Sequence, residues 1–155
     1  MSHEQRLAEL GIKLPEVAAP VAAYVPAVQT GRYVYTSGQL PFTEGSLPAT
    51  GKVGEGEGLV SPDDAAGYAR TCALNALAAV RSITGSLDSI SRIVKVVGFV
   101  ASDPAFTGQP GVINGASTVL GEIFGDAGLH ARSAVGVAVL PLDSPVEVEL
   151  VVELA

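Results

Sequence analysis

The alternation of apolar and polar residues is most regular at the end of the chain, over residues 146–154. Valine or leucine fills every second position, and glutamate fills most positions between them. A period of two predicts a β-strand with one face in a core. A second β-rich run, residues 130–141, precedes it, and a short segment with two prolines and an Asp-Ser pair separates the two. These signals are typical of a β-hairpin.

Three shorter runs rich in valine, isoleucine and aromatic residues are also predicted to be strands, namely Tyr24–Val28, Tyr33–Thr36 and Arg92–Ala101. The first two are separated by residues 29–32, which include a glycine and are predicted to form a hairpin turn.

Two helices complete the pattern. Residues 61–64, Ser-Pro-Asp-Asp, combine an N-cap serine, a proline at the first helical position and acids in the first turn. The helix that they begin is predicted to run to about Thr84 and end at Gly85. A second helix is predicted within Pro110–Phe124. The order β-β-α-β-α-β-β, with both helices on one face of a mixed sheet, predicts an α+β layer fold.

The chain is interpreted as one domain, residues 21–155, preceded by an N-terminal extension. This extension, Met1–Pro20, is expected to dock on the domain through a short helix within Ser2–Leu10. Apolar residues make up 48% of the chain and charged residues only 16%. With both helices on one face of the sheet, the other face needs a cover. The composition therefore predicts that neighbouring subunits supply it.

Charge and cysteine content exclude several classes of function. The net charge is −7 and no basic cluster occurs, which argues against nucleic acid as a partner. No apolar run is long enough to span a membrane, and the N-terminus lacks a signal-peptide pattern. One cysteine cannot form an internal disulfide, and two histidines with one cysteine cannot supply a convincing metal site. A cytoplasmic protein is therefore expected.

Arg132 is the candidate functional residue that the pattern itself identifies. It stands at the head of a row of small side chains, which predicts close packing against that face. A guanidinium at such a contact needs an acidic partner, either a protein carboxylate or a ligand carboxylate. Glu147 is most simply read as part of the solvated face of an edge strand. An even hairpin register would put Arg132 and Glu147 on opposite faces, so that a bulge or a neighbouring subunit would be needed to join them.

Other candidates have plain structural interpretations. Tyr24 suits a core or interface aromatic, and Asn114 suits a turn or helix cap. Cys72 lies among alanines and is expected to be a small buried apolar residue. A Ser-His-Asp triad would have to use His130, and no serine stands in a nucleophile elbow.

Three segments resemble the RidA/YjgF family, also called the liver perchloric-acid-soluble protein family: Thr36–Pro41, Ala131–Pro141 and Val146–Glu149. The resemblance extends over roughly residues 20–154. It implies a chorismate-mutase-like fold and a homotrimer with clefts between subunits. It also implies hydrolysis of reactive enamines and imines, such as 2-aminoacrylate, to 2-keto acids and ammonia without a cofactor.

The resemblance further implies roles for individual residues. Arg132 would grip the substrate carboxylate and Glu147 would position the attacking water. Five further residues would bind substrate or line the cleft: Tyr24, Ser37, Gly38, Asn114 and Ala134. Ala134 stands where many members have cysteine, so its backbone N–H is available but no thiol is.

Three functions are therefore weighed. The first is an imine and enamine deaminase. The second is a module of the same fold that binds small carboxylates without turnover. The third is an endoribonuclease, against which the acidic chain and the lack of a histidine pair or basic groove argue. The natural substrate and the role of His130 are left open.

Overall fold

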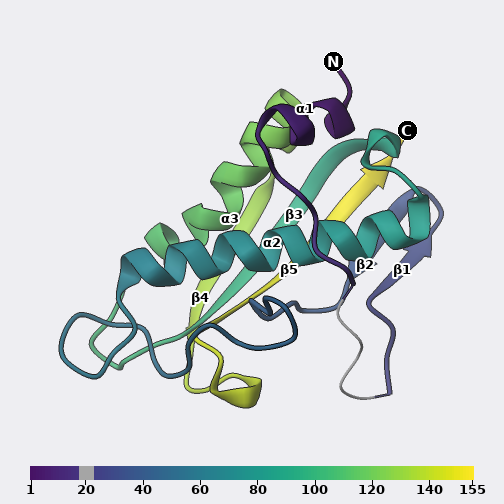
Figure 1. The fold of residues 1–155 in the computed structure, drawn as a ribbon. Helices are drawn as coiled ribbons and strands as arrows, with labels where there is room; N and C mark the ends of the chain where they lie inside the picture. Colours follow the sequence, from purple (N-terminus) through teal and green to yellow (C-terminus); the bar gives the residue numbers. More distant parts are fainter. Residues whose placement is uncertain (18–22) are drawn as a thin grey trace.

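A computed structural model describes residues 1–17 and 23–155, and in this part of the chain helices cover one face of a five-stranded sheet (Figure 1). The strands are β1 (Ala27–Thr30), β2 (Tyr33–Thr36), β3 (Ile90–Ala101), β4 (Ala131–Val137) and β5 (Val146–Leu154). The α-helices are α1 (His3–Glu9), α2 (Pro62–Thr84) and α3 (Gln109–Phe124). Short 3-10 turns are η1 (Leu87–Ser89), η2 (Gly125–Gly128) and η3 (Pro141–Asp143). The predicted order of strands and long helices is confirmed.

The last two strands do not form the predicted hairpin. The strand order is β1-β2-β5-β3-β4, so β3 lies between β4 and β5. It pairs in parallel with β4 and antiparallel with β5. The segment between β4 and β5 does turn, but its sequence does not show that β3 forms hydrogen bonds with both strands. The interpretation of Glu147 as part of an edge strand is wrong for the same reason, because β5 is the central strand.

Local sequence correctly predicts the two ends of α2. The Ser61 hydroxyl accepts a hydrogen bond from the Asp64 N–H at 3.1 Å, and Gly85 ends α2 in the left-handed conformation at φ 78°. The first strand begins at Ala27, later than predicted, because the predicted strand contains Pro26. Proline has no N–H to donate to a strand ladder.

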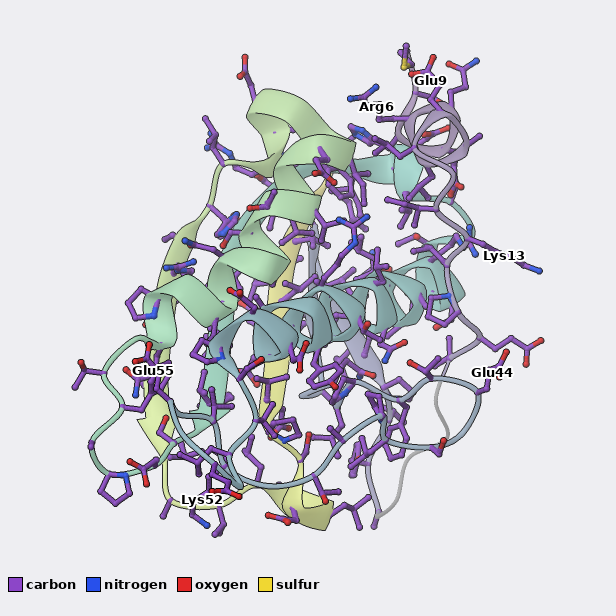
Figure 2. The ribbon with its side chains drawn as sticks, turned by 60° about the vertical axis from the view of Figure 1, so that its left-hand side comes forward. Arg6, Glu9, Lys13, Glu44, Lys52 and Glu55 are labelled. Atoms are coloured by element: carbon purple, nitrogen blue, oxygen red, sulfur yellow. The ribbon has the colours of Figure 1, made fainter. Side chains whose placement is uncertain are left out.

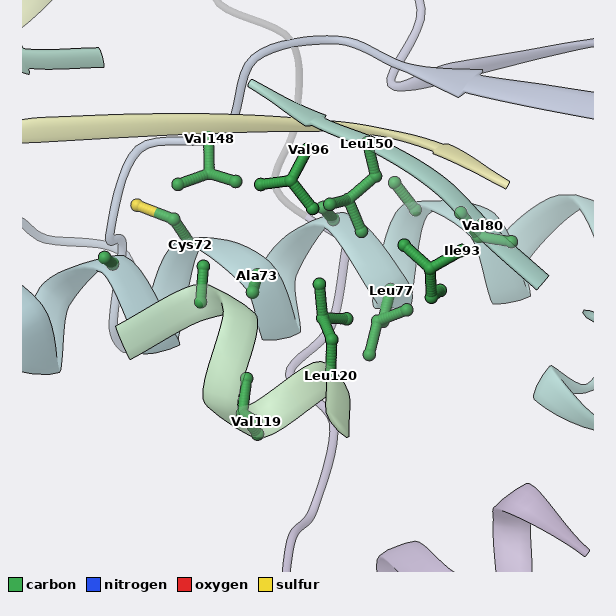
Figure 3. Close-up of a cluster of buried hydrophobic side chains, with 14 of the residues drawn as sticks. Cys72, Ala73, Leu77, Val80, Ile93, Val96, Val119, Leu120, Val148 and Leu150 are labelled. Carbon is green, nitrogen blue, oxygen red and sulfur yellow. The ribbon is translucent and has the colours of Figure 1, made fainter. Parts of the chain in front are cut away.

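The core lies between the sheet and the two long helices. Figure 3 shows side chains of α2 and α3 meeting those of β3 and β5 in this layer. On β3 and β5 the side chains that point toward the helices are fully or almost fully buried. The side chains of α2 and α3 that point toward the sheet are buried as well. Gly115 lets the helices approach closely, since a Cβ there would overlap the backbone carbonyl of Ala66. This packing fixes α3 over the β3–β4 side of the sheet.

The predicted N-terminal helix is present as α1 and docks on the domain. The Nε2 of His3 lies 3.1 Å from the carbonyl oxygen of Ile90, and Arg6 donates to the carbonyl of Glu122 at 3.0 Å. Arg6 and Glu9, both labelled in Figure 2, form an exposed 3.2 Å ion pair on this helix, with Arg6 on the side toward α3. The predicted boundary at Pro20 falls outside the described residues and stays a prediction. No helix among the described residues is long and apolar enough to cross a membrane.

Candidate functional site

Arg132 lies on the helix-covered face of the sheet and is held by α3. Its register partner on β3 is the fully buried Val96, which places both side chains on the same face. Nη1 donates to the Asn114 amide oxygen at 2.7 Å and to the Ser117 hydroxyl at 3.1 Å, and Nη2 donates to the Pro110 carbonyl at 3.3 Å. These three residues are spaced four and three apart, so they form one row on α3. The arginine therefore rests on a polar edge of the helix.

Small side chains bring α3 close enough to make these contacts. Ala134 follows Arg132 on the same face and pairs in register with Gly98. A Cβ at Gly98 would lie 2.5 Å from side-chain atoms of Ile113, which packs there from α3. The predicted close packing against the row of small residues is thus observed, and its cause is the approach of α3.

The expected acidic partner of Arg132 is not found in its own chain. Among residues 1–17 and 23–155, no carboxylate lies within 4.0 Å of the guanidinium, and the three hydrogen-bonded oxygens are all neutral. The side chain is also partly buried. Neutral acceptors satisfy hydrogen bonds but do not neutralise the charge, so the site favours an incoming anion.

Glu147 belongs to a second group of predicted residues on the open face of the sheet. Its position on β5 alternates with buried Val146 and Val148. The Glu147 carboxylate lies against Gly38, where a Cβ would overlap it. A larger residue at position 38 would therefore displace the Glu147 side chain.

Two more predicted residues, Ser37 and Tyr24, belong to the same region as Gly38. The Ser37 hydroxyl donates to the Val25 carbonyl at 2.6 Å, next to the 45% exposed Tyr24. Tyr24, Ser37, Gly38 and Glu147 therefore form one group. Arg132, Asn114 and Ala134 form the other.

The Glu147 carboxyl has a pKa above its ordinary value. Partial burial raises its pKa, and the neighbouring Glu149 carboxylate raises the pKa further. No hydrogen-bond donor to this carboxylate is found among the described residues. A half-buried carboxyl with a raised pKa and free oxygen atoms can hold a water molecule and accept its proton.

The single thiol, that of Cys72, is buried between α2 and the sheet and belongs to neither of these two groups. Cys72 is fully buried on α2, as expected, and burial raises the pKa of its thiol, with a further contribution from Glu147. The Cys72 thiol is buried and cannot act as a nucleophile, and position 134 is an alanine without a thiol. In the described part of the chain, no group of three His, Cys, Asp or Glu residues could hold a metal ion.

The two groups lie on opposite faces of the sheet. Glu147 pairs with Phe99, which pairs with Val135, whereas Arg132 pairs with Val96. One strand, β3, thus lies between the two residues, and they are offset by an odd number of positions along the strands. The bulges between β3 and β5 come earlier, between Ile90 and Lys95, and do not reverse this relation. Arg132 and Glu147 of one chain therefore cannot reach the same small molecule.

Two residues near Arg132, Ser117 and His130, have no role that the sequence alone predicts. The hydroxyl of Ser117 lies 2.9 Å from Nε2 of His130, and Nδ1 of His130 lies 2.6 Å from the Gly128 carbonyl. Their spacing is the available signal, because Ser117 follows Asn114 by three on a helix and His130 stands two residues before Arg132, next to the start of β4. That signal becomes useful only when α3 is known to lie over β4.

Comparisons with known proteins agree with this fold. Residues 4–154 match the family described as "YjgF/chorismate_mutase-like, putative endoribonuclease". Protein TCP17 of Trypanosoma cruzi is 43% identical over 149 residues, which are 96% of this chain and 91% of that protein.

Two solved structures illustrate the similarity. A "putative endoribonuclease" from Shewanella oneidensis MR-1 has a TM-score of 0.94 and 34% identity, with 99% of this chain and all of that chain covered. TdcF of Escherichia coli, solved with bound serine, has a TM-score of 0.66 and 25% identity, with 90% and 94% covered. The profile match over almost the whole chain, together with these relatives, shows that the protein belongs to the YjgF/chorismate-mutase-like family, which is also called RidA.

Proposed function

We propose that this protein hydrolyses small carboxylate-bearing imines, and the enamines that tautomerise to them, to 2-keto acids and ammonia. The observation that carries the proposal is the Arg132 guanidinium, which is held by neutral oxygens and has no carboxylate partner among the described residues of its own chain. A planar guanidinium binds a carboxylate through two parallel hydrogen bonds, each contributing about 1.5–3 kcal/mol. A small acid derived from an amino acid fits this requirement.

The second half of the proposed site is Glu147 of a neighbouring subunit. Because Arg132 and Glu147 of one chain face opposite sides of the sheet, a shared site needs two chains. The open face also carries exposed apolar side chains, namely Val28, Tyr33, Tyr35 and Val135. Such a face favours contact with another copy. We therefore propose a homotrimer with its sites between subunits, as in the family resemblance. A cytoplasmic location also stays a prediction from the sequence.

The proposed reaction requires orientation more than strong activation. Arg132 holds the substrate carboxylate, which places the adjacent imine carbon toward the neighbouring Glu147. With the imine nitrogen already protonated, this carboxylate accepts a proton from water as the oxygen attacks the imine carbon, and the resulting neutral carbinolamine carries OH and NH₂ on one carbon. The carboxyl returns its proton to the nitrogen and then takes the hydroxyl proton as the C–N bond breaks, so that ammonia leaves and the ketone forms. Loss of this last proton to solvent restores the carboxylate. A raised carboxyl pKa suits these transfers.

The test couples the protein to an amino-acid oxidase or a threonine dehydratase, which releases the imine or enamine, and follows keto-acid formation. Wild-type protein should accelerate this step, and Arg132→Ala should abolish the acceleration. Arg70→Ala is a matched control, because Arg70, unlike Arg132, already pairs with a carboxylate of its own chain, Glu122, at 3.1 Å. No acceleration by wild type, or equal acceleration by Arg132→Ala, would count against the proposal.

A second candidate is a module that binds small carboxylates without turnover. The related TdcF was solved with bound serine, which shows that a small amino acid occupies that relative. In this case Glu147→Gln should leave the affinity for pyruvate unchanged, and no keto acid should form faster with wild type. Deamination that is lost in Glu147→Gln while pyruvate binding persists would instead support the enzyme. Some relatives carry the description "putative endoribonuclease", and the net charge of −7 does not favour RNA binding here.

A further inference from the structure

Arg132, Ser117 and His130 form a chain of hydrogen-bonded side chains that begins on the side of Arg132 facing α3. Nη1 of Arg132 donates to the Ser117 hydroxyl at 3.1 Å. That hydroxyl lies 2.9 Å from Nε2 of His130, and Nδ1 of His130 lies 2.6 Å from the Gly128 carbonyl. Ser117 comes from α3, and His130 immediately precedes β4. The contacts therefore join the helix, the strand and the turn η2 behind the guanidinium.

The hydrogen positions in this chain follow from its last acceptor. A backbone carbonyl can only accept, so Nδ1 of His130 must carry the proton that it shares with Gly128. In the neutral ring Nε2 is then an acceptor, and the Ser117 O–H donates to it. The lone pairs of Ser117 Oγ are left to accept from Arg132. Every link has one donor and one acceptor, and all the donors point away from the arginine.

The result is a guanidinium that still has donors left for a ligand. Both Nη1 hydrogens are used, by Asn114 and Ser117, and one Nη2 hydrogen is used by Pro110. Among the described residues no acceptor takes the Nε hydrogen or the second Nη2 hydrogen. Nε and Nη2 share one edge of the planar group. An arginine held in this way loses less conformational freedom on binding than a freely rotating one.

We propose that Ser117 and His130 are positioning residues for the carboxylate site, which direct the Nε–Nη2 edge of Arg132 toward the ligand. Ser117 acts through Arg132, and His130 acts through Ser117. This inference rests on the proposed role of Arg132 in binding a carboxylate, but not on turnover. Ser117 is not assigned as a nucleophile, because its oxygen already accepts from Arg132 and it lies in the interior of α3.

The variants Ser117→Ala, Ser117→Thr and His130→Ala test the chain of contacts in the full-length protein. Thr118→Ala is the matched control, since it removes an exposed hydroxyl from the next position of α3. Pyruvate binding is measured by titration calorimetry. Ser117→Ala is expected to weaken binding about tenfold, the effect of losing one hydrogen bond to a charged group. Ser117→Thr should restore most of it, His130→Ala should weaken it by a smaller factor, and Thr118→Ala should change nothing.

Two further measurements separate positioning from a merely structural role. In the deamination assay, Ser117→Ala should raise KM while leaving kcat nearly unchanged. Nitrogen-15 NMR should show the proton of His130 on Nδ1, and the Arg132 Nε–H signal should shift on adding pyruvate. These NMR signals also keep the test valid if Ser117→Ala folds poorly.

The outcomes distinguish this inference from the proposed function. Wild-type protein that binds pyruvate without deaminating imines defeats the deaminase proposal and leaves the positioning role intact. The positioning role is overturned if wild type binds no pyruvate, if Ser117→Ala binds as tightly as wild type, or if Nε2 of His130 carries the proton. Covalent labelling of Ser117 by a fluorophosphonate would also overturn it, because the hydroxyl would then be a nucleophile.

Discussion

The Arg132 group and the Glu147 group differ in how far one chain completes them. Arg132 has three hydrogen bonds to α3, and Ser117 and His130 extend the contacts behind it. The Glu147 carboxylate packs against Gly38, and no donor to it is found in the described part of the chain. One group is already oriented, whereas the other has free oxygen atoms and a raised pKa.

This difference matches the two tasks in the proposed reaction. Binding a carboxylate gains from a rigid fork, because a fixed fork costs little entropy when the ligand arrives. Holding and deprotonating a water gains from a carboxylate whose lone pairs are free and whose pKa is closer to neutral pH. The two groups also face opposite sides of the sheet, so the comparison predicts that each chain supplies half of two different sites.

The largest expected effect comes from substituting Arg132 in one chain and Glu147 in another and then mixing the two variants. Arg132→Ala and Glu147→Gln should each lower deamination about 100-fold or more, since each removes one half of every site. When equal amounts are unfolded together and refolded, about a quarter of the sites should pair an intact arginine with an intact glutamate. The mixture should then regain about a quarter of wild-type activity. Mixing without refolding is the control, and no recovery after refolding would place both residues in one chain's site.

A smaller effect is expected from crowding the Glu147 group alone. Gly38→Ala would add a Cβ that overlaps the Glu147 carboxylate, so the side chain must move. Deamination should fall about tenfold while pyruvate binding at Arg132 stays close to wild type. Gly67→Ala is the control, because a Cβ meets nothing at this exposed helix position, and it should stabilise the protein by about 0.5–1 kcal/mol. Loss of pyruvate binding in Gly38→Ala would contradict the separation of the halves.

The smallest effect concerns stability and pH. The pKa of Glu147 is raised above 4.5 in the folded protein, so the native state holds this proton more tightly than the unfolded state. Its contribution to stability is therefore present below the unfolded pKa and is lost as pH rises through the folded pKa. Glu147→Gln should raise the free energy of unfolding at pH 7.5 by up to about 1 kcal/mol, a small value because solvent screens this half-buried group. The gain should vanish near pH 4.

Urea unfolding at one fixed protein concentration measures this effect. Glu153→Gln is the control from the same strand and face, where Arg32 lies 3.7 Å from the Glu153 carboxylate. That substitution should not stabilise the protein at pH 7.5. A Glu147→Gln variant that is less stable than wild type at pH 7.5 would show that the carboxylate has a favourable partner.

Several features followed directly from the sequence because they depend on neighbours along the chain. The start of α2 at Pro62 and its end before Gly85 are set by a capping serine and by a residue that tolerates positive φ. The alternation along β5 marked its buried face correctly. The segments around Gly38, Arg132 and Glu147 also identified the family that the profile match later showed.

The tertiary structure decided what those segments could not. It inserted β3 between β4 and β5, which turned the predicted hairpin into two separate pairings and made β5 central. It also placed α3 over β4, which brought Ser117 and His130 into contact behind Arg132. Hydrophobic periodicity and turn residues report on the environment of a segment, but not on which distant segment provides that environment. The sequence alone therefore determined the elements and their buried faces, and only long-range strand pairing and helix packing determined which polar side chains meet.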